Sequence, residues 1–180
     1  MIAQSWLGRI SQTLTTVDWD SVYADTLPRV FHFFCYRVGD KALAEDLTSI
    51  TFEKAWRNRH RYQRDVAGFE AWLFTIARNV AIDHFRSAPP VDSLDEDDQD
   101  RLASPESIET ALEQKDAYQM LSRLLHALPQ RDRELIALKY GTGLSNRSIG
   151  ELIGMSETHV STHLSRLVQK LRAQWDEARP

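Results

Sequence analysis

Basic and aromatic side chains are concentrated in one short segment of the chain. Four arginines fall within eight residues, with a tyrosine among them: Arg57, Arg59, Arg61, Tyr62 and Arg64. Guanidinium groups pair with phosphates and aromatic rings stack on unpaired bases, so this mixture suits single-stranded nucleic acid. For a bare run of charges, a solvated surface loop is the more common explanation. The segment alone therefore leaves both interpretations open.

A second candidate site lies near the C-terminus, in residues 148–167. Gly154 and Ser156 predict a tight turn between two short amphipathic helices, as in a helix-turn-helix. The second helix presents a polar face of Thr158, Ser161, Thr162, Ser165 and Arg166, flanked by His159 and His163. Hydroxyl groups and arginine bond to base edges and phosphates. The pattern favours duplex DNA binding over an ordinary helical hairpin with a polar exterior.

The two histidines of this helix would also allow a metal site. His159 and His163 are four residues apart, a spacing that places both on one helix face. The chain has no His-Glu-x-x-His pattern, no Gly-rich phosphate loop and no nucleophile elbow. We therefore expect no catalytic activity, no metal and no cofactor, and we assign both histidines to the DNA-binding surface.

The net charge of the chain conceals the basic character of these sites. The 180 residues carry a formal net charge of -4, and residues 89–114 alone contribute -8. That acidic stretch contains prolines and no apolar period, which predicts an extended linker. The flanking parts are neutral to basic, so the acidic total does not argue against a nucleic-acid partner.

Cysteine content and hydropathy bear on the cellular compartment. Cys35 is the only cysteine, so no intrachain disulfide can form, which suits a reducing environment. No run approaches the ~18 apolar residues of a membrane span, and no signal peptide is evident. We expect a cytoplasmic protein without membrane insertion.

Helical periodicity runs through both parts of the chain. Apolar residues recur at helical spacing from Phe69 to Val80 and from Ala117 to Leu128, and Pro28 should kink a first helix or begin a second one. We predict an all-α protein of two small helical domains joined by a flexible acidic linker. The expected boundaries are a tail at 1–19, domains at 20–88 and 112–176, and a linker at 89–111.

Three segments together resemble the bacterial RNA polymerase sigma factors of the sigma-70 family, in the compact extracytoplasmic-function (ECF) subfamily. "AEDLTSITFEKAW" is similar to the helix that grips the clamp helices of the largest polymerase subunit. "FEAWLFTIARNVAIDHFR" resembles the promoter-melting helix, and "LHALPQRDRELIALKYGTGLSNRSIGELIGMSETHVSTHLSRLVQKLR" resembles the domain that recognises the -35 element. The two domains would be sigma regions 2 and 4.

The resemblance implies a role for each group of residues. Core polymerase would be bound by Asp46, Ser49, Ile50, Phe52, Glu53 and Trp56. The single-stranded -10 element would be held by Arg57, Arg59, Arg61, Tyr62, Arg64, Arg78, Asn79 and Arg86. The duplex -35 element would contact the polar face of the C-terminal helix, and an anti-sigma factor is a further candidate partner.

Two departures from the family pattern affect these roles. Ser49-Ile50 stands where the family usually has Gln-Glu, so an apolar contact replaces a polar one. Ser161 and His163 stand where the family often has lysine and arginine, which predicts unusual or weak -35 recognition.

A helix-turn-helix regulator that binds duplex DNA without acting as a polymerase subunit is the alternative function. Phosphate neutralisation supplies most of the affinity for DNA, and Arg166 is the single arginine of the recognition helix. Such a helix is poorly equipped to bind unaided, and a regulator would leave the first domain unexplained. The sequence therefore favours a sigma factor, in which polymerase and the first domain hold this helix at the promoter.

Overall fold

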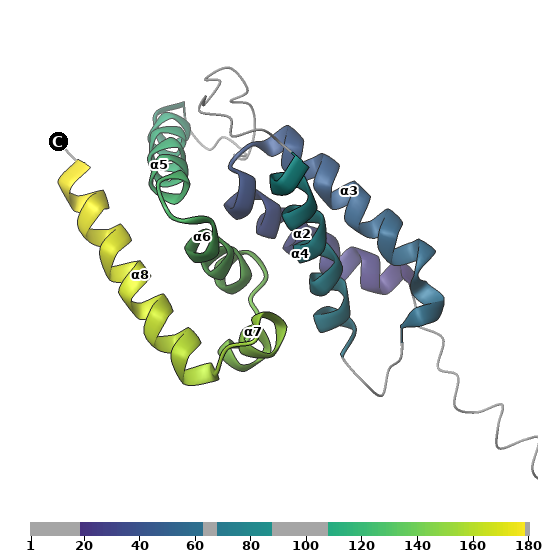
Figure 1. Cartoon of the computed structure of the whole chain (residues 1–180). Helices are drawn as coiled ribbons and strands as arrows, with labels where there is room; N and C mark the ends of the chain where they lie inside the picture. Colours follow the sequence, from purple (N-terminus) through teal and green to yellow (C-terminus); the bar gives the residue numbers. More distant parts are fainter. Residues whose placement is uncertain (1–18, 63–67, 88–107, 179–180) are drawn as a thin grey trace, which may run out of the picture.

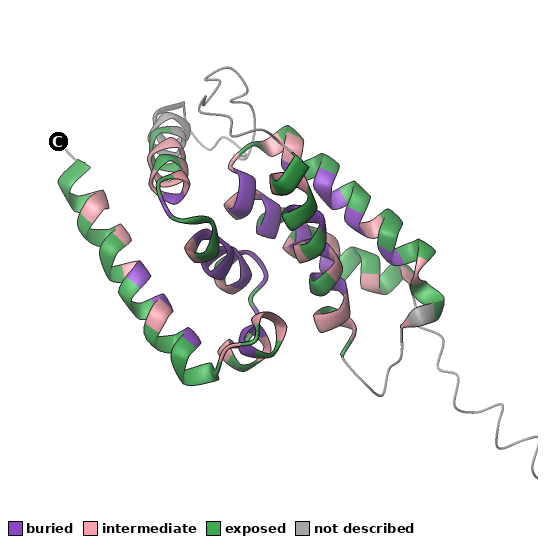
Figure 2. Ribbon diagram, in the orientation of Figure 1, coloured by how far each residue is buried: buried purple, intermediate pink, exposed green. Residues whose placement is uncertain are grey.

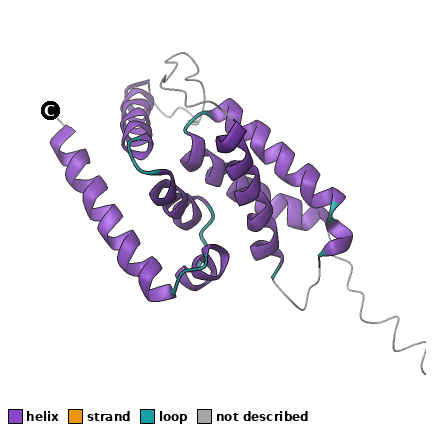
Figure 3. Ribbon diagram, in the orientation of Figure 1, coloured by secondary structure: helices purple, strands orange, loops and turns teal. Residues whose placement is uncertain are grey.

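The computed structural model describes residues 19–62, 68–87 and 108–178. Every regular element within these ranges is helical (Figure 3), which confirms the all-α prediction. The predicted tail up to residue 18, Arg64 and most of the predicted linker lie outside the described residues. None of the described helices is both long enough and apolar enough to cross a bilayer.

The N-terminal half consists of three long helices and a short turn (Figure 1). They are α2 (Trp19–Val38), α3 (Lys41–Arg57), the 3-10 turn η1 (Arg59–Arg61) and α4 (Phe69–Ser87). Helix α4 begins at Phe69, where the apolar spacing begins, and it continues past Val80 to Ser87. Trp19, which the sequence analysis assigned to the tail, is instead the first residue of α2.

Pro28 lies inside α2 and does not begin a second helix, so that alternative is wrong. Proline removes one backbone hydrogen bond, but buried Val30 and Phe34 anchor the turns that follow it in the core. Helix α2 ends at Val38 and is followed by Gly39, whose φ of 74° lies in the left-handed region and whose amide donates to the Cys35 carbonyl. Asp40 then caps α3, because its Oδ1 accepts from the Leu43 amide at 2.7 Å.

The C-terminal half is built from four helices and one π-type turn. They are α5 (Ile108–His126), α6 (Gln130–Ile136), η2 (Ala137–Gly141), α7 (Asn146–Ile153) and α8 (Glu157–Ala178). The predicted linker end at residue 111 is wrong, because α5 already begins at Ile108. Acidic residues at the start of a helix favour it, so the negative charge there did not mark a loop.

Local capping produces the turn between α7 and α8 as predicted. The Ser145 hydroxyl accepts from the Ser148 amide at 3.1 Å at the start of α7. Gly154 ends that helix in the left-handed region, with φ 73°. Ser156 accepts from the His159 amide at 3.3 Å and caps α8. These three residues confirm the helix-turn-helix geometry.

The two halves contribute buried residues to one hydrophobic cluster, and Figure 2 shows buried positions in the helices of both halves. Helix α6 lies between α8 and the group formed by α2 and α4, and α2 packs along α6 and η2. The residues of α6 from Arg133 to Ile136 are buried, whereas the outer face of α8 is exposed. The apolar cluster includes Phe33 and Phe74 from one half and Leu138 and Val160 from the other. The two helical domains predicted from the sequence are present, and they pack against each other through this cluster.

Candidate nucleic-acid interface

The candidate polymerase-binding residues form one exposed face of α3. Five of the six are exposed and Phe52 is half-buried: Asp46, Ser49, Ile50, Phe52, Glu53 and Trp56. Ile50 is 39% exposed and Trp56 is 51% exposed. The Phe52 ring packs against Tyr23 of α2, with centroids 4.7 Å apart. The face is therefore acidic with large apolar side chains open to a partner, a mixture typical of protein interfaces.

An aromatic cluster joins the start of α2, the end of α3 and the start of α4. Its members are Trp19, Trp56, Tyr62, Phe69 and Trp72. The Trp19 ring makes edge contacts with Trp56 and Phe69, at centroid distances of 5.5 and 5.6 Å. Tyr62 lies 5.5 Å from both Phe69 and Trp72. Such edge contacts between rings stabilise a fixed arrangement, so this cluster positions the basic segment.

Sequence reasoning did not identify this cluster. It assigned Trp19 to the tail and Trp56 to the polymerase face. A usable signal was present, because Trp19 precedes Tyr23 by four residues and thus continues the spacing of the first helix.

Two arginines of the basic segment lie exposed beside the cluster. The Arg59 guanidinium stacks over the Trp56 ring at 4.2 Å and donates to the Trp56 carbonyl at 2.8 Å. Arg57 pairs with Glu53 one turn earlier, at 2.6 Å. Exposed i,i+4 pairs contribute little to stability, so the Arg57 guanidinium can exchange Glu53 for a phosphate. Arg61 belongs to η1.

The three polar residues assigned on α4 differ in their surroundings. Asn79 is exposed, and so is Arg86, whose Nη2 lies 3.0 Å from Asp83 Oδ1. Arg78 is half-buried, and its Nε donates to Glu134 Oε1 of α6 at 2.6 Å. The sequence-based expectation that Arg78 is available to a ligand is not met in this arrangement, because a carboxylate from the other half holds it.

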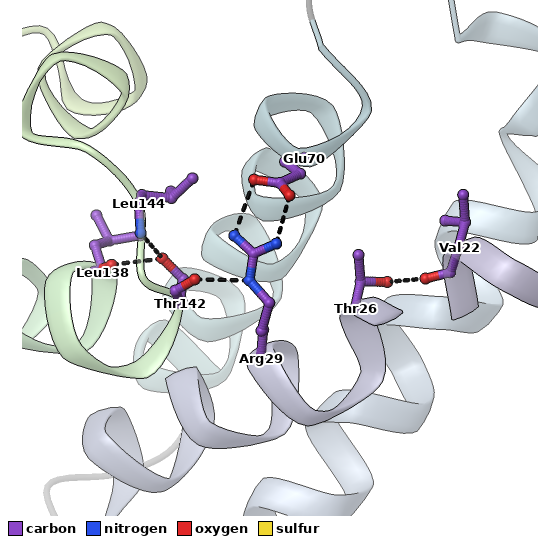
Figure 4. Close-up of polar contacts among 7 residues, drawn as sticks. All are labelled: Val22, Thr26, Arg29, Glu70, Leu138, Thr142 and Leu144. Atoms are coloured by element: carbon purple, nitrogen blue, oxygen red, sulfur yellow. Dashed lines mark hydrogen bonds and ion pairs between the residues drawn. The ribbon is translucent and has the colours of Figure 1, made fainter. Parts of the chain in front are cut away.

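Arg29 forms polar contacts with both the start of α4 and the loop after η2 (Figure 4). Its guanidinium makes a bidentate pair with Glu70, and its Nε donates to the Thr142 carbonyl at 2.7 Å. The hydrogen bond from Arg29 holds the pKa of Glu70 below its usual range. Thr142 in turn accepts from the Leu144 amide at 3.1 Å. This network orients α4 and connects the two halves of the chain.

The polar face of α8 is largely open, as a DNA-reading surface requires. Six of the seven assigned residues are exposed: Thr158, His159, Ser161, Thr162, Ser165 and Arg166. His163 is half-buried, and its Nε2 lies 2.8 Å from Asp132 Oδ1 of α6. This histidine therefore links α8 to α6 and is less accessible than the other six residues. Among the described residues, no three His, Cys, Asp or Glu side chains are grouped to hold a metal.

A shallow groove of about 310 Å³ runs beside this face. Ser161 and Ser165 line it together with Lys139, Tyr140, Asn146, Leu164, Val168, Gln169 and Arg172. Thr158, Thr162 and Arg166 recur every four residues and so form the adjacent stripe of α8. The assigned residues thus divide between an open stripe and the edge of a groove.

Each half of the chain matches a profile built from known protein families. The profile of Sigma-70 region 2 matches residues 22–89, and that of Sigma-70 region 4 matches residues 118–171. The ECF RNA polymerase sigma factor BldN of Streptomyces coelicolor is 36% identical over 164 residues, which cover 87% of this chain and 59% of BldN. The ECF RNA polymerase sigma factor SigL of Mycobacterium tuberculosis is 31% identical over 137 residues, which cover 74% of this chain and 75% of SigL.

A solved structure shows the same fold. The sigma factor RpoE from Bartonella quintana, in complex with the anti-sigma factor NepR, aligns with a TM-score of 0.69. The alignment covers 90% of this chain and 99% of that chain, at 22% identity. Together with the helix-turn-helix geometry of α7 and α8, the two profile matches and these relatives show that the chain belongs to the ECF sigma factors, the non-catalytic subunits that bind core RNA polymerase and direct it to promoters.

Proposed function

We propose that three sites, on α3, on the end of α3 with α4, and on α8, have separate roles in transcription initiation. The exposed face of α3 binds core polymerase, the end of α3 with α4 holds the single-stranded -10 element, and α8 contacts the duplex -35 element. The observation that carries the proposal is the position of Arg57 and Arg59, exposed beside an aromatic cluster. Phosphate pairing and base stacking are thereby available at one place on the surface.

Opening of the promoter would use binding energy and no covalent chemistry. Taking a base out of the stack costs a few kcal/mol, as in enzymes that flip bases. The exposed arginines and Asn79 would offset that cost by contacts that only the unpaired strand offers. Because α3 and α4 are packed together, polymerase binding on α3 would present this surface to the -10 region.

Recognition of the -35 element would depend on tethering. A recognition helix with one arginine neutralises few phosphates, so its own affinity for DNA is low. When polymerase and the -10 contact hold the protein at the promoter, the second contact becomes intramolecular and needs little further affinity. The protein would act in the cytoplasm, where polymerase and promoters are found.

An anti-sigma factor is proposed as a further partner. The structures of similar fold include sigma factors in complex with anti-sigma factors, RpoE with NepR among them. Co-purification of this chain from its host, followed by mass spectrometry, would identify such a partner, and recovery of polymerase subunits alone would argue against it.

Run-off transcription with core polymerase tests the proposal directly. We expect promoter-specific transcripts from genomic fragments only when core polymerase and this protein are both present. If no such transcript appears and core polymerase is not bound, the proposal is wrong. Binding of duplex sites by the protein alone in a gel-shift assay would instead favour the helix-turn-helix regulator.

Replacing Arg166 with alanine should lower transcript yield from a promoter with an intact -35 element by about tenfold. One well-placed arginine contributes about 1–3 kcal/mol of discrimination between bases. Arg123→Ala, which removes an exposed arginine from α5, provides the control and should leave the yield unchanged. The comparison is made by run-off assay on promoters with intact and scrambled -35 elements, and an equal loss on both would contradict base recognition by Arg166.

A further inference from the structure

One large apolar side chain interrupts the otherwise polar outer face of α4. The exposed positions along this face recur every three or four residues and so lie on one side of the helix: Thr75, Asn79, Ile82 and Arg86. Ile82 is 37% exposed, although isoleucine is among the residues most often buried. Single exposed apolar residues are common on protein surfaces, so exposure alone does not mark Ile82 as functional. Its position does, because residues assigned to the -10 strand lie before and after it on the same face.

The charged groups beside Ile82 are suited to holding a nucleic-acid strand. The Nη2 of Arg86 lies 3.0 Å from Asp83 Oδ1, and the Nζ of Lys54 on α3 lies 3.7 Å from Asp83 Oδ2. These side chains are 47% to 78% exposed, so the two pairs contribute little to stability and both cations can turn to phosphates. A strand bound by Lys54 and Arg86 would pass the end of α4 that carries Ile82.

The position of Ile82 is fixed by the packing of α4. Val80 and Ala81, the two residues before it, are buried at 3% and 1% exposure. On the next turn the half-buried Phe85 ring lies 4.6 Å from the Arg37 guanidinium of α2. Isoleucine is branched at Cβ, which in a helix leaves one strongly preferred χ1 rotamer. Ile82 therefore presents a stiff apolar group on a rigid support.

Cations by themselves do not distinguish an open promoter from a closed one. Phosphates are present on paired and unpaired strands alike, whereas the face of a base becomes accessible only when the base leaves the stack. A group that contacts this face is bound more strongly in the open state and so favours opening. Among the described residues of α4, Ile82 is the large apolar side chain that is exposed.

We propose that Ile82 is a wedge residue, which packs against the first unstacked base of the -10 element while Asn79 and Arg86 hold the strand. The inference rests on the proposed role of α4 at the -10 strand and adds to it the group that separates the bases. Architectural proteins that kink DNA insert isoleucine, leucine or phenylalanine between base steps in a similar way.

Ile82→Ala tests the wedge, because it removes the apolar surface and is compatible with a helix. Ile82→Leu is the matched control, since it keeps an apolar side chain of the same size. Each variant is assembled with core polymerase on two versions of one promoter, fully paired and mismatched throughout the -10 element. Permanganate reactivity of unpaired thymines measures opening, and run-off assay measures transcript yield.

We expect Ile82→Ala to lower the open fraction and transcript yield on the paired promoter by about tenfold, the loss expected when contact with most of one isoleucine side chain is removed. On the mismatched promoter, where the bases are already separated, its yield should stay within about twofold of wild type. Ile82→Leu should resemble wild type on both promoters. Circular dichroism of each variant checks that its helices are intact.

The proposal is overturned if Ile82→Ala, when folded, opens the paired promoter as wild type does, or loses the same factor on both promoters. Equal losses for Ile82→Ala and Ile82→Leu would also overturn it. Arg86→Ala separates this failure from failure of the proposed function. If α4 holds the -10 strand and only the wedge is wrong, Arg86→Ala still lowers the yield on the mismatched promoter, whereas an unchanged yield would contradict the role of α4 itself.

Discussion

Replacing Ile50 with lysine is expected to lower the affinity for core polymerase by about 100-fold, or about 2.7 kcal/mol. Ile50 is 39% exposed on α3, and the proposed interface would bury it. A lysine there would carry a charge into a desolvated contact, at a cost well above the lost apolar area. Anisotropy of dye-labelled sigma factor titrated with core polymerase measures the change.

Two further variants show whether the loss belongs to this face. Ile82 is similarly exposed, at 37%, but lies on α4, so Ile82→Lys should leave core affinity within a few-fold of wild type. Ile50→Glu restores the residue that resembling sigma factors usually carry here and should cost less than Ile50→Lys. Equal losses for Ile50→Lys and Ile82→Lys would show that α3 is not the contact surface.

The free energy of unfolding is expected to fall by about 3–5 kcal/mol when Phe33 is replaced by alanine. Phe33 is fully buried, packs against Phe34 and Phe74 at 5.1 and 6.5 Å, and lies against Gly141 of the other half. Domains are typically stable by about 5–15 kcal/mol, so a loss of this size removes much of the margin. Urea unfolding provides the measurement.

The position of Phe33 also predicts how the chain unfolds. Because both halves contribute to one core, tryptophan fluorescence and circular dichroism should report a single transition at the same urea midpoint. Phe31→Ala, at a half-buried position of the same helix, should cost clearly less. Separate transitions, with only the N-terminal half affected by Phe33→Ala, would contradict a shared core.

Sequence patterns were sufficient where neighbouring residues decide the structure. The start of α4 follows from its apolar spacing, and the turn between α7 and α8 follows from Ser145, Gly154 and Ser156. The same approach was wrong at Pro28, where core packing kept α2 continuous, and at the start of α5, where acidic residues looked like linker. Tertiary contacts outweigh local preference at such positions.

The candidate sites also include features that neighbouring residues decide and features that tertiary contacts decide. The arginines beside Trp56 and the exposed stripe of α8 could be assigned from residue types, because they depend on one helix end and one helix face. Trp19 could not, since its partners lie on α3 and α4.

By itself, the sequence determined the all-α class, the family and the helices that would carry each candidate site, because these depend on residue types and spacing over short distances. Only the tertiary structure decided that the halves share a core, that Glu134 holds Arg78 and that Asp132 holds His163. Those pairs join residues from different helices, and no local pattern encodes how packed helices bring distant charges within bonding distance.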